Sequence, residues 1–238
     1  MALRNSSSMS EQPKIVVIEH GPYVVTGHVP LSVEVITPNR DGGSWEWKCE
    51  RTFEDRERYR LCRCGHSKTK PYCDGTHNEI GFDGTETASG APFAQQAETT
   101  DGPTLVLKDA ESFCASARFC DNYGSAWELV TQSDKKKQRE LTIHEVERCP
   151  SGRLVLRDKK TGRPLEPEFE PSIGLVQDPV KARSGPLWVR GGIPVESASG
   201  VRYETRNRVT LCRCGASENK PFCDGSHLKA KFNDGLLD

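Results

Sequence analysis

The sequence predicts a mainly β protein with a small α content: two copies of one β-rich module and a middle α+β insert. Three observations predict this. A cysteine-rich segment occurs twice in the chain. Short runs of alternating, β-branched residues precede each copy. A third segment with two strand-like runs of its own separates the copies. We place the first module at residues 13–82, the insert at 103–158 and the second module at 185–234.

The composition favours several small units over one large core. Only 34% of the 238 residues are hydrophobic. The 33 Lys and Arg balance 34 Asp and Glu, which argues against a nucleic-acid partner. No apolar run approaches the ~18 residues of a membrane span, and the polar start MALRNSSSMSEQP lacks the apolar core of a secretion signal. Ten cysteines in such a chain therefore favour metal ligation over disulfides, in the cytoplasm or a similar reducing space.

The strand-like runs lie ahead of the cysteines in both modules. They are VVIEH, YVVTG, LSVEVI and WEWKC in the first module, and LWVRG, VRYET and RVTLC in the second. The run GPYVVTGHVPL at residues 21–31 is echoed by GPLWVRGGIPV at residues 185–195. The first module is longer between this echo and its cysteines, and we place the extra residues around Asp41–Gly43.

The repeated segment reads LCRCGHSKTKPYCDGTH at residues 61–77 and LCRCGASENKPFCDGSH at residues 211–227, without a gap. We call these the first and second ligand loops, because their Gly, Pro and Asp content predicts loops. Each has Cys-x-Cys, then eight residues, then Cys, then three residues, then His. The candidate ligands are Cys62, Cys64, Cys73 and His77 in the first loop, and Cys212, Cys214, Cys223 and His227 in the second.

Three thiolates and one imidazole suit either a tetrahedral zinc or a two-iron cluster with two protein ligands per iron. Structural zinc usually uses Cys pairs that are two to four residues apart. The closer Cys-x-Cys spacing suits an extended chain that holds one iron of a flat two-iron unit, with Cys-x3-His on the other iron. The spacing favours the cluster without excluding zinc.

The pattern Cys-x-Cys-x2-Ser-x3-Pro-x-Cys-Asp-Gly-[Ser/Thr]-His resembles the CDGSH iron–sulfur family, to which mitoNEET-type proteins belong. Both copies match every position, with Ser67 and Ser217 at the Ser position. The resemblance implies one 2Fe–2S cluster per motif, held by three Cys and one His, hence two 2Fe–2S clusters in the chain. It also implies that the two modules pack about a two-fold axis, here as an internal pseudo-dimer within a monomer.

Other residues of the ligand loops have supporting roles in this interpretation. Asp74 and Asp224 are predicted to cap the backbone amides that follow them. Lys70 and Lys220 either place positive charge near a cluster or are solvated. The Gly-, Ala-, Thr- and Ser-rich residues 83–102 and the proline-spaced residues 166–185 are predicted to be linkers.

Within the insert, TLVLKD and RLVLRD are predicted to be paired strands. The aromatic residues Phe119, Tyr123 and Trp127 are four apart, which predicts one face of a helix that packs against the modules. Cys49, beside Trp47 in the first module, is predicted to be a packing residue.

The insert carries Cys114, Cys120 and Cys149 in the pattern Cys-x5-Cys followed by Cys-Pro-Ser-Gly. This pattern resembles a divergent ferredoxin-like domain with a single 4Fe–4S cluster, sometimes found beside CDGSH motifs. A four-iron site normally uses four thiolates, so Asp121 or His144 would have to supply the fourth ligand. The alternative, which we favour from the sequence, is that the three are buried structural thiols.

The predicted function is electron transfer or cluster transfer, with a redox partner or an apo iron–sulfur acceptor protein as the partner. The chain shows no phosphate-binding Gly loop, nucleophile–base pattern or flavin fingerprint, so a carrier is favoured over an enzyme. Because a His ligand can be protonated, the clusters are predicted to be acid-labile. The alternative is a zinc-stabilised interaction module with no redox role.

Overall fold

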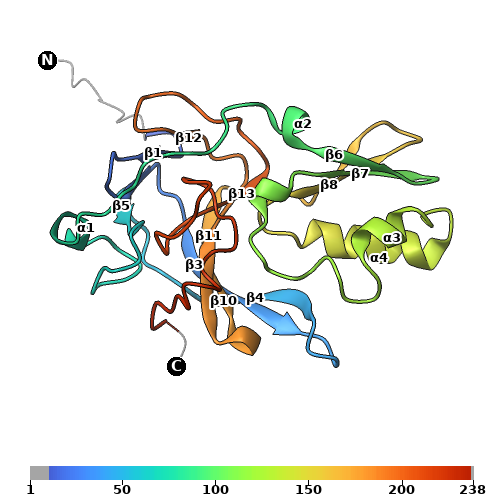
Figure 1. The fold of residues 1–238 in the computed structure, drawn as a ribbon, viewed down its shortest axis with the longest axis horizontal. Helices are drawn as coiled ribbons and strands as arrows, with labels where there is room; N and C mark the ends of the chain where they lie inside the picture. The colour runs from blue at the N-terminus through green and yellow to red at the C-terminus, as the bar shows by residue number, and fades with distance from the viewer. Residues whose placement is uncertain (1–10, 237–238) are drawn as a thin grey trace, which may run out of the picture.

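The computed structural model describes residues 11–236, so most of the predicted polar leader lies outside the described residues. The protein is mainly β, with 31% strand and 14% helix in three sheets, which confirms the predicted fold class (Figure 1). Between residues 11 and 236, no helix has the length and apolar character needed to cross a bilayer.

Two of the sheets repeat one arrangement. The first has the order β12-β1-β2-β5, and the second has the order β13-β11-β10-β3-β4. We call the chain before the insert the first half and the chain after it the second half. In each sheet, three antiparallel strands of one half pair in parallel with a strand of the other half, and in the second sheet β4 follows that strand. The strands of the first sheet are β1 (Lys14–Val17), β2 (Tyr23–Thr26), β5 (Arg58–Leu61) and β12 (Val195–Glu196). Those of the second are β3 (Leu31–Pro38), β4 (Ser44–Thr52), β10 (Ser172–Asp178), β11 (Arg183–Arg190) and β13 (Arg208–Leu211).

The register shows that the two sheets are equivalent. Ile15 of β1 lies opposite Val25 of its own half and Val195 of the other half. Ile173 of β10 likewise lies opposite Val189 of its own half and Leu31 of the other. The halves therefore exchange a strand in both directions, which is the internal pseudo-dimer that the resemblance implied.

One apolar core lies between the two sheets. It joins Tyr23 and Leu61 from the first half with Leu187 and Leu211 from the second, all of them 0–1% exposed. The prediction of several small units is therefore wrong for the two modules. Strands of four residues cannot enclose a core alone, so the apolar residues of both copies are pooled in one interface.

The extra residues of the first module form the hairpin of β3 and β4, as predicted. At its turn, the Asn39 carboxamide oxygen accepts the N–H groups of Asp41 and Gly43 at 2.9 and 2.8 Å. Trp47 of β4 packs on Trp188 with ring centroids 4.6 Å apart. Cys49, on the same strand, is exposed, so its predicted packing role is wrong.

The predicted linker at residues 166–185 is also wrong, because it contains β10 and the start of β11. Pro171 and Pro179 directly flank β10 and do not interrupt it, which is where proline is compatible with a strand. The other predicted linker is a loop up to a short helix, α2 (Phe93–Gln96), and it continues into β6 (Glu98–Asp101).

The insert has a sheet of its own in the order β6-β7-β8-β9, with two helices packed against it (Figure 1). The predicted strand pair is confirmed as β7 and β8, which run antiparallel. The predicted aromatic helix is wrong, because α3 begins only at Ala126. Ser125 caps it by accepting the N–H of Glu128, so Phe119 and Tyr123 lie in the preceding loop. The remaining elements are α1 (Thr76–Glu79), β7 (Leu105–Asp109), α3 (Ala126–Val130), α4 (Lys136–Glu147), β8 (Leu154–Asp158), β9 (Pro164–Leu165) and the 3-10 turns Glu111–Phe113 and Pro179–Lys181.

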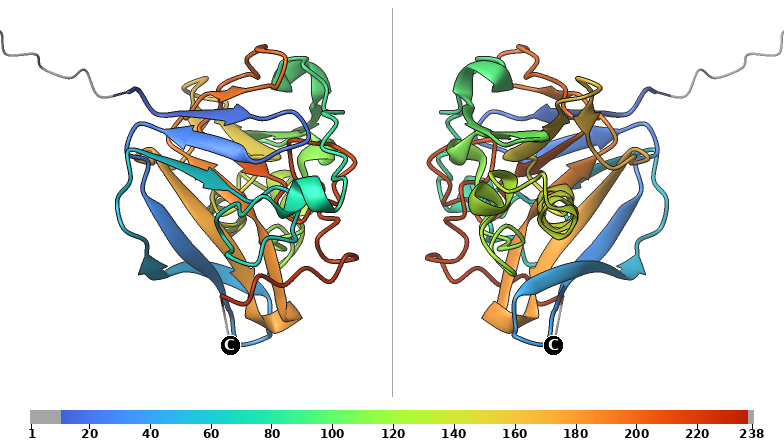
Figure 2. Two further views of the ribbon diagram at one scale, coloured as in Figure 1. Left: turned by 90° about the vertical axis from the view of Figure 1, so that its left-hand side faces the viewer. Right: turned by 90° about the vertical axis from the view of Figure 1, so that its right-hand side faces the viewer.

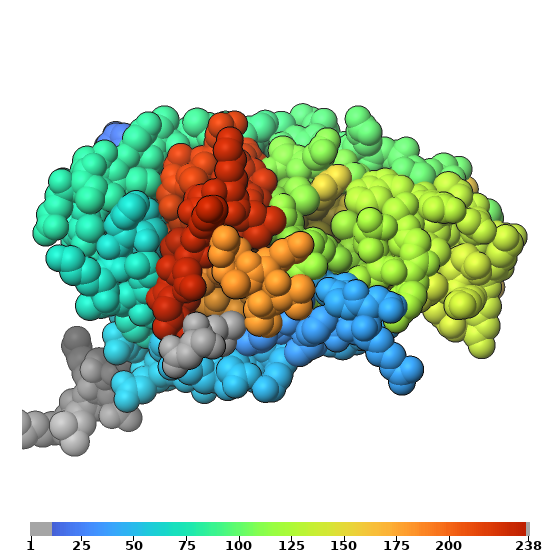
Figure 3. All heavy atoms as spheres, turned by 60° about the horizontal axis from the view of Figure 1, so that its bottom comes forward, coloured from blue at the N-terminus to red at the C-terminus, as the bar shows by residue number. Residues whose placement is uncertain are grey.

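The second ligand loop lies between the first half and the insert. In Figure 3 it is part of the red segment, with the teal residues of the first module on one side and the green residues of the insert on the other. Figure 2 shows the β strands of both halves side by side in the same body, from two opposite directions. The two ligand loops therefore have different neighbours.

Candidate iron–sulfur sites

The predicted ligands come together as two pairs in each loop. The sulfurs of Cys62 and Cys64 are 3.8 Å apart, and Cys73 Sγ is 3.4 Å from His77 Nδ1. In the second loop the corresponding distances are 3.7 Å for Cys212–Cys214 and 3.5 Å for Cys223–His227. A metal with bonds of about 2.3 Å to sulfur and about 2.0 Å to nitrogen, at tetrahedral angles, separates such ligands by about 3.8 and about 3.5 Å. The donor atoms of each pair therefore fit one metal between them.

The backbone fixes the two pairs against each other by the same contacts in both loops. The last residue of each preceding strand forms a β-bridge to the loop, Leu61 to Tyr72 and Leu211 to Phe222. The N–H of Cys62 donates to Pro71 O at 2.8 Å, and that of Cys212 donates to Pro221 O at 2.8 Å. The Cys-x-Cys end of each loop is thus hydrogen-bonded to the segment that carries the third cysteine. The Lys70–Pro71 and Lys220–Pro221 peptide bonds are both cis.

The polar residues that both loops share form hydrogen bonds to this backbone. Asp74 accepts the N–H groups of Lys68 and Thr76 at 2.7 and 3.0 Å, and Asp224 accepts those of Glu218 and Ser226 at 2.8 and 3.0 Å. These contacts confirm the predicted capping role. Lys70 and Lys220 donate to the carbonyl oxygens of Ser67 and Ser217 at 2.7 and 2.6 Å, so they are bound to the loop backbone, and their placing of positive charge near a cluster stays a prediction.

Arg63 and Arg213, the residues between the paired cysteines, are parts of the site that sequence reasoning missed. They are 1% and 3% exposed. Arg63 donates to the carbonyl oxygens of Ile18 and Gly84, and Arg213 donates to those of Gly185 and Val176 and pairs with Asp234. Each anchors its Cys-x-Cys segment to distant backbone, Arg63 to the end of β1 and a loop, and Arg213 to strands β10 and β11. The repeated LCRC sequence was the available signal.

Hydrogen bonds favour the thiolate form at the first cysteine of each pair. The hydrogen bond from Cys64 lowers the pKa of Cys62 below the usual thiol range, although burial opposes this, and backbone amides of the loop add to the lowering. Cys214 does the same for Cys212. Because a thiolate is the metal-binding form of cysteine, this environment suits a metal ligand at Cys62 and Cys212. Burial has the opposite effect at Cys73 and Cys223, whose pKa values it raises.

The two ligand loops meet at their glycines. A Cβ on Gly65 would lie 2.6 Å from Cys214 O, and a Cβ on Gly215 would lie 2.6 Å from Cys64 O. Both glycines have a φ of +81°, so both the contact and the backbone conformation require glycine here. A cavity of about 350 Å³ opens beside this contact, lined by Cys64, Cys214, Phe82 and Phe232 among others.

Burial distinguishes the two sites. Cys73 and His77 are half-buried, whereas Cys223 and His227 are 2% and 5% exposed. Burial, and after it the Arg213 guanidinium, lowers the pKa of His227 to about 4. The imidazole of the second loop is therefore held in the neutral form, which is the form that binds metals.

The three insert cysteines come together around a small cavity of about 30 Å³, which Ala117, Ser151 and Arg153 also line. Burial, and after it the nearby thiols of Cys149 and Cys114, raises the pKa of Cys120 to about 12. The residues between Cys114 and Cys120, here called the insert loop, have positive φ at two non-glycine positions, Ser116 (52°) and Arg118 (64°). Such backbone turns its N–H groups toward one side, as at many anion and iron–sulfur sites.

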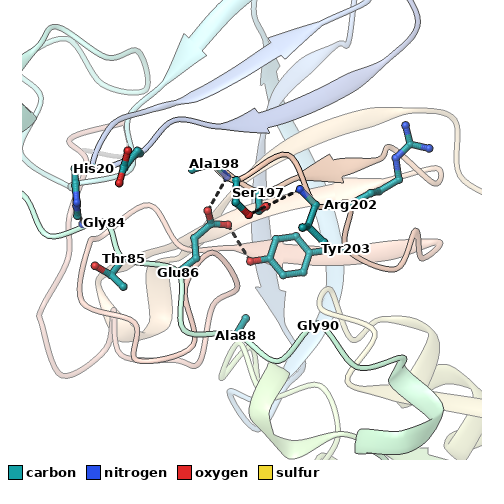
Figure 4. Close-up of a pocket in the computed structure, with 13 residues that line it drawn as sticks. His20, Gly84, Thr85, Glu86, Ala88, Gly90, Ser197, Ala198, Arg202 and Tyr203 are labelled. Carbon is teal, nitrogen blue, oxygen red and sulfur yellow. Dashed lines mark hydrogen bonds between the residues drawn. The ribbon is translucent and has the colours of Figure 1, made fainter.

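A larger cavity of about 540 Å³ lies away from all of these cysteines (Figure 4). Its carboxylate, Glu86, accepts the Ala198 N–H at 2.8 Å and the Tyr203 hydroxyl at 2.9 Å. The Ser197 hydroxyl accepts the Val201 N–H at 3.0 Å. Glu86 thus holds its segment against the second half, and the Ser197 hydroxyl is engaged within the second half.

Two family models match the chain. The model described as iron-binding zinc finger CDGSH type matches at residues 20–78 and 184–228, and the model described as divergent 4Fe-4S mono-cluster matches at residues 100–159. No match was found among curated proteins. None was found among solved structures.

These matches and the paired ligands define an iron–sulfur protein. Within that class, the chain carries the iron-binding CDGSH domain at two places, residues 20–78 and 184–228, which matches a tandem member with two motifs in one polypeptide. The match at residues 100–159 also supports the resemblance of the insert to a divergent ferredoxin-like domain.

Proposed function

We propose that each ligand loop holds one 2Fe–2S cluster through its three cysteines and its histidine, and that the protein is a one-electron carrier. The observation that carries this proposal is the pairing of donors, two per metal position, at distances of 3.4–3.8 Å in both loops. Two metals with two protein ligands each account for two pairs, whereas one zinc would need all four donors around a single point. Among residues 11–236, no group of three or more His, Cys, Asp or Glu side chains has the geometry to hold a single metal ion.

The chemistry of the donor set also fits a cluster. When bound, a 2Fe–2S cluster would accept and release single electrons, and a His ligand raises the potential relative to an all-Cys cluster. The chain's own contribution is to favour the thiolate form at Cys62 and Cys212, to hold each imidazole next to the third cysteine of its loop, and to anchor the loops through the buried Arg63 and Arg213.

A further iron–sulfur cluster in the insert belongs to the same proposal. The three thiols around one cavity and the family match at residues 100–159 favour the cluster over the structural-thiol alternative. The carrier is inferred to be a monomer, because its two halves already complete each other's sheets. We infer a reducing compartment such as the cytoplasm and a redox protein as the partner.

Cluster donation to an apo acceptor is a second candidate, and it is favoured only for the first loop. There Cys73 and His77 are half-buried and therefore within reach of an acceptor's thiols. The second loop lacks this access because Cys223 and His227 are covered.

The test is anaerobic purification with a visible spectrum and iron, sulfide and zinc analysis of the same sample. Two 2Fe–2S sites require about four irons and four sulfides per chain, and a cluster in the insert requires iron beyond that number. About two zincs per chain with no visible absorbance would support the zinc-stabilised module and would contradict the carrier. A redox titration of the coloured protein would then show whether both oxidation states are stable, as a carrier requires.

A further inference from the structure

The insert lacks the second cysteine of the usual four-iron sequence, and its Cys-Pro pair comes from a more distant segment. In the bacterial run, cysteines spaced by two residues are combined with a cysteine that precedes proline. Here Cys114 and Cys120 have the spacing of the first and third cysteines, and Cys149–Pro150 supplies the Cys-Pro pair. Ala117 stands where the second cysteine would be. Because its side chain ends at Cβ, it offers no donor atom.

The structure excludes Asp121 and His144 as the fourth ligand of the insert cluster. His144 is stacked on Trp45 with ring centroids 3.7 Å apart, and its Nε2 faces Glu46 at 3.9 Å. Asp121 is exposed and pairs by a backbone bridge with Ser125. Neither lines the cavity that the three thiols surround.

Two hydroxyl groups of the cavity are also accounted for. The Ser116 hydroxyl is turned toward the second ligand loop, since a Cβ on Gly225 would lie 2.2 Å from its oxygen. The Ser151 hydroxyl accepts the N–H of Arg153 at 3.2 Å and lies 3.5 Å from Cys149 Sγ. Of the residues that line this cavity, Cys114, Cys120 and Cys149 are the ones with thiols.

We propose that Cys114, Cys120 and Cys149 are the three protein ligands of the insert cluster, and that one iron position there has no protein ligand. That iron is exchangeable, and it takes a small ligand from solution such as water or a small thiol. The inference rests on the proposed cluster in the insert. In a four-cysteine ferredoxin every iron has a protein ligand, whereas here one iron would not. The protein then exists in a four-iron and a three-iron form.

The interconversion balances. An oxidant such as ferricyanide takes one electron from the four-iron form, which releases one ferrous ion and leaves the three-iron form. Ferrous ion and a reductant reverse it. Oxidised two-iron and four-iron clusters are diamagnetic and an oxidised three-iron cluster is paramagnetic, so the two-iron clusters of the ligand loops do not obscure the signal.

The experiment is electron paramagnetic resonance of the full-length protein after ferricyanide treatment, with iron analysis, for the wild type, Ala117→Cys and the matched control Ala117→Ser. We expect the three-iron signal in the wild type and in Ala117→Ser, and its disappearance when ferrous ion and dithionite are added. Ala117→Cys is expected to lose the signal and to retain about one more iron per chain after oxidation.

A wild type that keeps a full four-iron complement and gives no signal under ferricyanide would overturn the inference while leaving the proposed function intact. If Ala117→Cys then gave the same absence of signal and the same iron count as that wild type, a protein ligand would already complete the site. Iron limited to the two ligand loops in the wild type would overturn both this inference and the insert cluster. Because the wild type alone shows the reversible conversion, a poorly folding variant does not prevent the test.

Discussion

In the first ligand loop Cys73 and His77 are half-buried, whereas in the second Cys223 and His227 are 2% and 5% exposed. The sequences of the two loops are nearly the same, and so are their ligand distances and backbone hydrogen bonds. The difference comes from what lies against them. Gly75 faces open space, but Gly225 lies against Ser116 of the insert.

Three contacts bind the insert to the second loop. The rings of Phe113 and Phe222 meet edge to face with centroids 5.0 Å apart. The Asn219 side chain donates to Ser112 O at 2.8 Å. Together with the contact at Gly225, they show that one ligand-loop sequence can form an accessible site or a protected one, depending on its neighbour.

The largest expected effect concerns the ion pair that only the second loop has. Arg213 pairs with Asp234 in a fully buried setting, whereas Arg63 has carbonyl partners and Gly84 stands at the place of Asp234. Asp234→Asn leaves the Arg213 charge without its partner and should lower the free energy of unfolding by about 3 kcal/mol. The measurement is anaerobic urea unfolding of the cluster-loaded protein.

The matched control for this change is Asp83→Asn in the first module, at an exposed position of the corresponding segment. Little change is expected there. Equal losses in the two variants would contradict the difference between the loops.

The next effect is a pH dependence that acts through the insert. Glu145 of α4 is fully buried and accepts the N–H groups of Asn122 and Tyr123, and burial raises its pKa from 4.5 to about 7. The neutral carboxyl is therefore the stable form in the folded state. Its contribution is complete below pH 4.5 and is lost as the pH rises through about 7, which amounts to at most about 3 kcal/mol.

Glu145→Gln should remove this loss, so that the variant is more stable than the wild type at pH 8 and similar to it at pH 5. Glu140→Gln, on the exposed part of the same helix, is the control and should follow the wild-type profile. Thermal unfolding at the two pH values measures both. If the stability of the wild type and of Glu145→Gln changed equally between pH 5 and pH 8, the Glu145 carboxyl would already be ionised in the folded protein.

A third test uses the two equivalent glycines. Gly75 and Gly225 have φ of +94° and +87°, so alanine costs about 1–2 kcal/mol of backbone strain at either. Gly225→Ala must in addition displace Ser116, for about 1–3 kcal/mol more. The extra cost should vanish in a Ser116→Gly background, as measured by a double-mutant cycle of unfolding free energies. An unchanged difference in that background would locate the cost elsewhere.

The smallest expected effect is on the rate of cluster loss. Acid protonates the imidazole ligand and so competes with the metal, and a chelator needs access to it. With a chelator at mildly acidic pH, the part of the visible absorbance that comes from the two ligand loops should decay in two phases about tenfold apart, equivalent to about 1.4 kcal/mol. The fast phase is assigned to the first loop.

His77→Cys should abolish the fast phase, because a thiolate ligand replaces the accessible imidazole, and His227→Cys should leave that phase in place. A single phase in the wild type would mean that the surroundings of the two loops do not control cluster loss.

Much of the site could be predicted from the sequence, because the ligand spacing and the turn residues act over short stretches of chain. Cys-x-Cys and Cys-x3-His bring their donors together locally, and Asp74 and Asp224 cap amides two residues away. The pairing of β7 with β8 and the hairpin at Asn39–Gly43 follow from similar local patterns. The β-rich class follows because β-branched alternation is also a local property.

The rest was decided by tertiary contacts between segments that are far apart in the chain. The exchange of β3 and β12 between the halves creates the single core, and no composition value indicates it. The carbonyl groups that Arg63 and Arg213 bind belong to distant strands and loops. Two nearly identical loops became an open and a covered site because the insert packs on only one of them, and burial depends on the neighbours that folding brings together.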